Sequence, residues 1–155
     1  MSETSLTSLL QGVFESATSL QTVILPPALQ TIGNYAFQYC SSLSSIDLPE
    51  TVIGIGYYTF HACTALQTIN FPANLEEIDQ YAFRNTGLTE VTLPENLTTL
   101  GSYAFLNSTS LKSACLNKKI DYTRGFDYFS GCSALETLRI YAGSVPNTSD
   151  SYMGF

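Results

Sequence analysis

The sequence predicts a solenoid, a single elongated domain built from stacked coils of parallel strands. Two observations lead to this fold class. A leucine recurs at spacings of 22 to 24 residues along most of the chain, and a similar run of residue types follows each one. The anchoring leucines are Leu20, Leu43, Leu66, Leu88, Leu111 and Leu135. Because one repeat of this length cannot bury its apolar side alone, consecutive repeats must stack on one another.

The first half of each repeat predicts a short strand with one face toward the core. Apolar residues occur at every second position after the leucine, a period typical of a half-buried strand. In four repeats a proline follows directly, and it is expected to end the strand because it has no N–H to donate. The inward residues are Val23 and Leu25, Ile46 and Leu48, Ile69 and Phe71, Val91 and Leu93, Ala114 and Leu116, and Leu138 and Ile140.

The second half of most repeats carries a glycine and, four residues later, a phenylalanine. Gly33, Gly56 and Gly101 share one position, which Asp79 occupies in another repeat. Glycine there predicts a bend with positive φ, a conformation that Asp tolerates better than most residues. The aromatic residues are expected to form a stacked ladder of rings at the centre of the core. They are Phe37, Phe60, Phe83 and Phe105.

The repeats divide a single domain of 155 residues. A partial repeat spans 6–19, repeats start at 20, 43, 66, 88 and 111, and a terminal repeat with a polar cap spans 135–155. The segment 85–87 is one residue short, which predicts a local irregularity near Leu88. The repeat from 111 to 134 lacks the proline and Ile-Gly signals. At the other end, the half coil from Leu6 is expected to leave an open, apolar, strand-edged surface.

The run Leu43-Ser-Ser-Ile-Asp-Leu-Pro49, followed by Ile55-Gly56 and Thr59-Phe60-x-x-Cys63, resembles the BspA-like class of leucine-rich repeats. The resemblance covers nearly the whole chain, from about residue 6 to 142. It implies a fold between mixed α/β and mostly β, with a parallel sheet on one wall and short strands, turns or helical turns on the other. Members of this class look like adhesion and host-interaction proteins, so the resemblance implies a cell-surface or secreted location.

The charge distribution argues against nucleic-acid binding. The net charge is −7, and only one basic residue, Arg84, occurs before Lys112. Binding to a phosphate backbone needs clustered Lys and Arg, which this acidic body lacks. The residues of the only basic patch, interpreted mainly as a solvated surface, are Lys112, Lys118, Lys119, Arg124 and Arg139. No run of 18 apolar residues occurs, so membrane insertion is not expected.

Residues that often carry chemistry have structural explanations in this chain, so we expect neither an enzyme nor a cofactor. Cys40, Cys63 and Cys132 share a repeat position with Ala, Thr and Ser, which favours buried free thiols over a ladder disulfide. His61 occupies a variable position beside Phe60 and is expected at the surface. The cluster of Glu76, Glu77 and Asp79 is interpreted as a solvated turn, because a dedicated calcium loop alternates its oxygen ligands. No catalytic residue and no metal ligand are therefore assigned.

Two surfaces are candidates for binding a partner. The first is the outward face of the predicted strands, whose candidate residues are Thr22, Ile24, Ser45, Asp47, Thr68, Asn70, Glu90, Thr92, Ser113 and Arg139. The second is a tyrosine column on the opposite wall, which either anchors a partner or packs across the coils with its hydroxyls exposed. Its members are Tyr35, Tyr58, Tyr81 and Tyr103.

The leading hypothesis is a non-catalytic binding domain of an adhesin that uses the outward strand face. Its expected partner is a protein or glycan on a host or neighbouring cell. This expectation rests on the family resemblance and on the use of extended faces by solenoids. The alternative is a structural unit that self-assembles end to end through the open apolar end described above.

Overall fold

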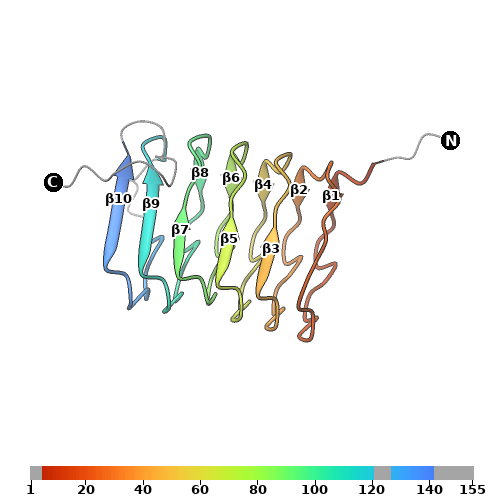
Figure 1. Ribbon diagram of the computed structural model, residues 1–155, viewed down its shortest axis with the longest axis horizontal. Coiled ribbons are helices and arrows are strands. Elements are labelled where there is room, and N and C mark those ends of the chain that lie inside the picture. The colour runs from red at the N-terminus through yellow and green to blue at the C-terminus, as the bar shows by residue number, and fades with distance from the viewer. Residues whose placement is uncertain (1–4, 121–126, 142–155) are drawn as a thin grey trace.

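The computed structural model describes residues 5–120 and 127–141, which form a solenoid with one coil per repeat (Figure 1). The chain advances by one strand spacing with each turn, so equivalent residues of successive repeats line up along the long axis. The predicted C-terminal cap and Arg124 lie outside the described residues. Within the described ranges no helix occurs, so turns and short strands replace the helical turns that the family resemblance allowed.

Parallel strands line two walls of the solenoid (Figure 1). The first, called the sheet wall, carries one pair and one triplet of strands. The pair is β3 (Ser45–Asp47) with β5 (Thr68–Asn70), and the triplet is β7 (Glu90–Thr92), β9 (Ser113–Asn117) and β10 (Thr137–Tyr141). The second wall carries a five-stranded sheet. Its strands, in spatial order, are β1 (Ser8–Leu9), β2 (Thr31–Ile32), β4 (Gly54–Ile55), β6 (Glu77–Ile78) and β8 (Thr99–Leu100).

The predicted strands of the sheet wall form in five of the six repeats. Residues 22–25 adopt no strand, and they lie in the first coil of this wall. The strands β3, β5 and β7 are three residues long and end two residues before a proline. In β9 and β10 the proline position is held by Asn117 and Tyr141, and both strands extend to it over five residues. Proline therefore limits strand length, because it cannot donate to the ladder.

The sheet wall is interrupted between β5 and β7, where the short repeat predicted an irregularity. The missing residue is absorbed in the turn at 85–87. There Gly87 N donates to Cys63 O at 3.4 Å, and a Cβ on Gly87 would collide with Thr64 O. Beyond this turn the coil returns to register, because Leu88 and Val91 are buried like their equivalents.

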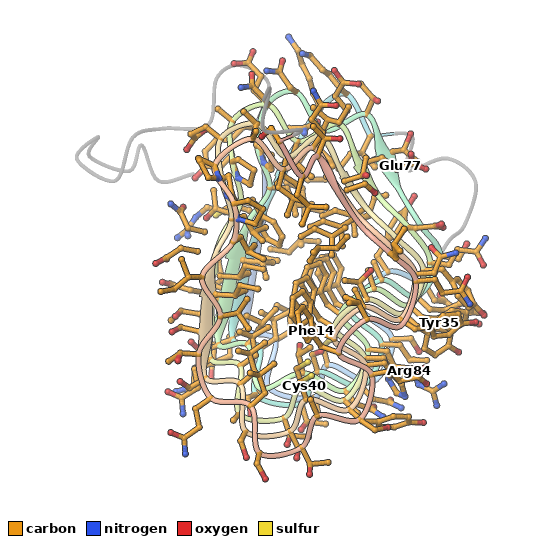
Figure 2. The ribbon with its side chains drawn as sticks, turned by 90° about the vertical axis from the view of Figure 1, so that its right-hand side faces the viewer. Phe14, Tyr35, Cys40, Glu77 and Arg84 are labelled. Carbon is orange, nitrogen blue, oxygen red and sulfur yellow. The ribbon has the colours of Figure 1, made fainter. Side chains whose placement is uncertain are left out.

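A ladder of phenylalanine rings fills the centre of the core, as predicted. The four predicted rings are fully buried, and successive centroids are 5.2 to 5.4 Å apart with nearly parallel planes. The structure extends the ladder by one ring at each end, to Phe14 and Phe129. Figure 2 looks down this column, with Phe14 inside the coil. Leucine, isoleucine and valine side chains surround the rings and complete one continuous core.

The prediction of positive φ at the repeated glycines is wrong. Gly33, Gly56 and Gly101 avoid that region, and they are required because the preceding coil is too close for a side chain. A Cβ on Gly33 would lie 2.6 Å from Leu9 O, and one on Gly56 would lie 2.5 Å from Asn34 Oδ1. The glycine position is thus a contact between backbones and not a bend.

Positive φ occurs instead at two positions of the following turn. The first is the tyrosine column, with φ between 55° and 60°, and the second lies four residues later in each coil. The four later residues are Tyr39, Ala62, Asn85 and Asn107. Each left-handed residue costs roughly 1–2 kcal/mol relative to the right-handed form. Hydrogen bonds to the next coil hold this conformation, for example from Tyr35 N to Tyr57 O and from Tyr39 N to His61 O, both 2.9 Å.

We expect Phe60→Ala to lower the free energy of unfolding by about 3–5 kcal/mol, because it opens a cavity between two stacked rings in a dry core. Chemical denaturation followed by circular dichroism measures the loss. Thr68→Ala, an exposed change on β5, is the control and should stay within about 0.5 kcal/mol of wild type. A cost for Phe60→Ala below about 1 kcal/mol would contradict the central role of the ring ladder.

The stability of the fold should change in opposite directions when Gly54 and Gly56, two glycines of one coil, are each replaced by alanine. Gly56→Ala should destabilise the fold by about 1–3 kcal/mol, because the new methyl group meets the backbone of Asn34. Gly54→Ala should be neutral or stabilising by up to about 1 kcal/mol, since the nearest atom is Thr31 Cγ2 at 4.0 Å. Thermal unfolding of the two variants tests the close-approach explanation, and equal melting temperatures would refute it.

Candidate functional site

The sheet wall presents one row of outward side chains, as the strand alternation predicted. We call the ten predicted binding residues the outward row. Nine of them are exposed and Ser113 is half-buried. The exposed members are Thr22, Ile24, Ser45, Asp47, Thr68, Asn70, Glu90, Thr92 and Arg139. Ile24 is the most exposed large apolar side chain among the described residues, at 99%.

Parallel pairing without a register shift places equivalent outward residues opposite each other. The pairs are Ser45 with Thr68, Asp47 with Asn70, Glu90 with Ser113, Thr92 with Cys115, and Cys115 with Arg139. Paired strands lie about 4.8 Å apart, so these side chains form a regular array along the wall. The interruption between β5 and β7 divides the array into two parts.

The chemistry of the outward row suits hydrogen bonding and ion pairing. Hydroxyl, amide and carboxylate groups dominate it, with Asp47 and Glu90 contributing negative charge and Arg139 positive charge near the last described strand. The row itself contains no histidine or cysteine. Cys115, on the same face, is half-buried, and its Sγ lies 3.9 Å from the Tyr141 hydroxyl.

The tyrosine column forms a second ordered array, which we call the tyrosine ladder: Tyr35, Tyr58, Tyr81 and Tyr103. All four rings are half-buried, and consecutive centroids are 5.8, 4.8 and 5.3 Å apart with planes within 28° of parallel. Figure 2 places Tyr35 on the outside of the coil, on the side opposite the strands of the sheet wall. Stacking covers ring faces and leaves edges and hydroxyls toward solvent, which agrees with the packed interpretation of the column.

Two further side chains belong to this surface, and the sequence reasoning did not assign them to it. The ring of Tyr57 is nearly perpendicular to those of Tyr35 and Tyr81, at 83° and 90°, and its centroid lies 4.4 Å from that of Tyr58 at an interplanar angle of 62°. Arg84 donates from Nη1 to the Tyr58 hydroxyl at 3.3 Å, and its guanidinium carbon lies 5.9 Å from the Tyr81 ring centroid. The one available signal was charge, because Arg84 is the only basic residue before Lys112.

Comparison with protein families shows which family shares this architecture. The model of the BspA type leucine rich repeat region matches six copies over two overlapping stretches, residues 2–112 and 30–151. The chain belongs to the BspA-type leucine-rich repeat family. The family resemblance drawn from the sequence is therefore confirmed.

Solved structures similar to this BspA-type domain come from several bacteria. A leucine-rich repeat protein of T. pallidum shares 30% identity over 90% of this chain with a TM-score of 0.81. One from Bacteroides ovatus shares 30% over 86% with a TM-score of 0.76. The pneumococcal vaccine antigen PcpA shares 27% over 78% with a TM-score of 0.69.

The chain spans 65% of the length of the T. pallidum protein, 34% of the Bacteroides protein and 30% of PcpA. It therefore corresponds to part of each of these longer chains. A comparison with curated protein sequences found no match.

The expectation that His61 lies at the surface is wrong. The side chain of His61 is buried, and Nδ1 donates to the Arg84 carbonyl at 3.1 Å. Its ring also meets Tyr39 and Tyr58 edge to face, with centroids 5.3 and 5.0 Å away. Burial lowers the pKa of His61, and the Arg84 charge lowers the pKa further, while the bond to the carbonyl opposes both effects. The contacts that bury His61 come from Tyr39 of the preceding coil, Tyr58 of its own coil and Arg84 of the next coil.

The cysteines of the repeated column are free thiols that serve the packing, as expected. Cys40, Cys63 and Cys132 are buried, and each donates from Sγ to the carbonyl of a phenylalanine in the preceding coil at 3.1 to 3.2 Å. In another coil Ser108 Oγ donates to Phe83 O at 2.9 Å. Burial raises the pKa of all three thiols, that of Cys63 far above its usual range. Neutral thiols at this position are poor nucleophiles.

The remaining charged groups do not form a compact site. Lys112 precedes β9, whereas Lys118 and Lys119 follow it at the opposite end of the strand, so the basic residues are spread out. Glu76 and Glu77 are exposed as predicted, but the solvated-turn interpretation is wrong about the turn, because Glu77 belongs to β6 and Asp79 is half-buried. Within the described residues, no group of three or more His, Cys, Asp or Glu side chains is placed to hold a metal ion. No helix in the same part of the chain could cross a membrane.

The buried His61 should make the stability of the BspA-type domain depend on pH. The unfolded chain, with a histidine pKa of about 6.5, binds a proton more readily than the folded chain does. The free energy of unfolding therefore falls as the pH decreases through about 6.5 toward the lowered pKa of the folded state. Urea denaturation at several pH values should show a smaller acid-side loss for His61→Gln than for wild type. Parallel pH profiles would contradict the effect of burial on His61.

Proposed function

We propose that this chain is a non-catalytic protein-binding domain of a cell-surface or secreted adhesin. It engages a protein of a host or neighbouring cell through the outward row of the sheet wall. The observation that carries this proposal is the separation of roles along β3, β5 and β7, where the middle residue faces the core and its two neighbours are exposed. In β3, for example, Ile46 is buried in the core while Ser45 and Asp47 on either side are exposed.

Stacking gives the outward row the rigidity that a recognition surface needs. The backbone of β9 is hydrogen-bonded between β7 and β10, and the inward residues of β7 and β9 pack on the ring ladder. A partner that binds such a surface loses little free energy to ordering it. Extended faces of this kind are the usual binding surfaces of solenoids.

The composition of the outward row favours a protein over a glycan. The ten residues include hydroxyl, amide and charged groups and one fully exposed isoleucine, but no aromatic ring. Glycan recognition commonly adds an aromatic platform for the sugar face, which this row lacks. Negative charge at Asp47 and Glu90 and positive charge at Arg139 supply electrostatic complementarity for a partner with separated basic and acidic patches.

Similarity to the pneumococcal vaccine antigen PcpA supports placement at the cell surface or outside the cell. An antigen used in a vaccine must be reachable by the immune system of the host. PcpA is thus a similar structure that is exposed in this way, and we extend that exposure to this domain.

Affinity capture from host-cell and matrix extracts tests the proposal. The bait is wild type beside a variant carrying Asp47→Lys, Asn70→Ala, Glu90→Lys and Thr92→Ala. Because all four residues are exposed, the variant should fold normally, which circular dichroism checks. We expect a partner that wild type retains and the variant loses, with at least a tenfold weaker affinity when the purified pair is measured.

A matched control carries the same change in charge on the other wall: Glu76→Lys, Glu77→Lys, Thr98→Ala and Thr99→Ala, all exposed. It should retain the partner. Equal capture by wild type and both variants would show that the sheet wall is not the binding face, and capture of nothing would favour a spacer role.

End-to-end assembly is the second candidate function, and exposed apolar residues near β1 support it. Leu6, Leu10 and Val13 are 54%, 75% and 47% exposed, and β1 pairs only with β2 among the described strands. An unpaired strand edge beside apolar side chains is a template for another chain. Sedimentation velocity at several concentrations should then show mass increasing with concentration for wild type but not for Leu10→Glu. A monomer at every concentration would exclude this function.

A further inference from the structure

The tyrosine wall carries a positive charge for which residues 5–120 and 127–141 provide no ion-pair partner. We define the tyrosine wall as the tyrosine ladder together with Tyr57 and Arg84. Within the described residues, no carboxylate forms an ion pair with Arg84, whose side-chain partners are the Tyr58 hydroxyl and the Tyr81 ring. Its Nε is buried and has no hydrogen-bond partner there. The guanidinium is thus partly desolvated without a counter-charge, an arrangement that costs stability in the free protein.

The position of Arg84 is fixed by the ladder. Stacked rings on successive coils hold Tyr58 and Tyr81 in place, and Nη1 is bound to the Tyr58 hydroxyl. The backbone of Arg84 is also held, because its carbonyl accepts from Ala62 N at 2.8 Å and from His61 Nδ1 at 3.1 Å. Figure 2 shows Arg84 and Tyr35 on the outside of the same wall, away from Phe14 in the interior. A guanidinium held in this way has less side-chain freedom to lose when a ligand binds.

From this geometry we infer that the tyrosine wall is a second binding surface, which recognises an aspartate or glutamate side chain of a protein partner at Arg84. The carboxylate takes the place of the missing counter-charge and accepts hydrogen bonds from the guanidinium. Apolar side chains beside that carboxylate pack on the edges of Tyr57 and the ladder. The surface is separate from the outward row, so this inference does not depend on the proposed function.

The observations favour a protein over an acidic sugar. Both faces of Tyr58 and of Tyr81 are covered by neighbouring rings, so neither offers the open face on which a sugar stacks. What the wall offers is rigid tyrosine area, hydroxyls and one arginine, the combination enriched at the energetic centres of protein interfaces. A single carboxylate also fits better than a polyanion, since nine acidic residues and one basic residue precede Lys112.

A random dodecapeptide library displayed on phage and panned on the immobilised wild-type domain supplies the probe. We expect enriched peptides to share an Asp or Glu flanked by apolar residues. A synthetic peptide of that sequence should bind wild type at least tenfold more tightly than Arg84→Gln. Replacing the peptide's own acidic residue by its amide should cause a similar loss, and combining both changes should add little further loss.

Three other variants separate the contact from general effects. Lys118→Gln removes the same charge from an exposed site outside the wall and should change the dissociation constant less than twofold. Arg84→Lys keeps the charge without the planar fork and should bind with intermediate affinity. Tyr58→Phe keeps the ring but removes the hydroxyl that holds Nη1, so it should weaken binding several-fold while the fold, followed by thermal unfolding, stays intact.

Four outcomes would overturn the inference. They are failure to enrich any peptide, enrichment without an acidic residue, equal affinity of wild type and Arg84→Gln, and equal losses for Arg84→Gln and Lys118→Gln. An array of sialylated and neutral glycans forms the second arm. Binding to acidic glycans that depends on Arg84, in the absence of peptide binding, would assign the wall to a sugar instead.

Discussion

Stacking of similar coils at one fixed spacing is the constraint on which this structure depends. Phenylalanine centroids 5.2 to 5.4 Å apart lie close to the ~4.8 Å spacing of paired strands, so rings and backbones advance together. A residue inserted or deleted between the strand and the phenylalanine of one coil would disrupt both the strand pairing and the ring stacking. The one short repeat accordingly loses its residue at 85–87, after Phe83 and before Leu88, and only the strand pairing of the sheet wall is interrupted.

Because successive coils are related by one fixed shift along the long axis, polar groups inside their turns form recurring hydrogen bonds. In four coils the small residue of the cysteine column donates to a phenylalanine carbonyl of the preceding coil: Cys40, Cys63, Ser108 and Cys132. Cys63 and Ser108 thus occupy equivalent places with the same bond. Thr86 differs, because its hydroxyl donates to Phe83 O of its own coil. Burial of His61 follows from the same geometry, since its Nδ1 also donates to a carbonyl of an adjacent coil. Several of these carbonyls also accept a backbone N–H, for example Phe37 O from Cys40 N and Arg84 O from Ala62 N, so the side chain adds a second hydrogen bond to each.

The sheet wall and the tyrosine wall differ in chemistry, although the same repeat builds both of them. On the sheet wall the inward residues are fixed by packing, while the outward ones vary from Ile24 to Asp47 to Arg139, so this face can encode a particular partner. On the tyrosine wall the repeat itself supplies the surface, and only the additions of Tyr57 and Arg84 distinguish one coil from another. A varied face and a repetitive face on one domain are the two binding surfaces that we propose.

The sequence by itself determined the coil length, the inward columns as far as Leu116, the ring ladder and the outward row, because each depends on a periodicity that any stacked arrangement must respect. Leu138 and Ile140, which were predicted to face inward, are 51% and 55% exposed. Tertiary structure alone decided matters that depend on the distance between neighbouring coils. Gly33 and Gly56 are required by the backbone of the preceding coil and not by their own φ angles. Likewise, the hydrogen bond of buried His61 to Arg84 O and that of Arg84 to the Tyr58 hydroxyl join residues 23 and 26 positions apart, where no local pattern records the contact.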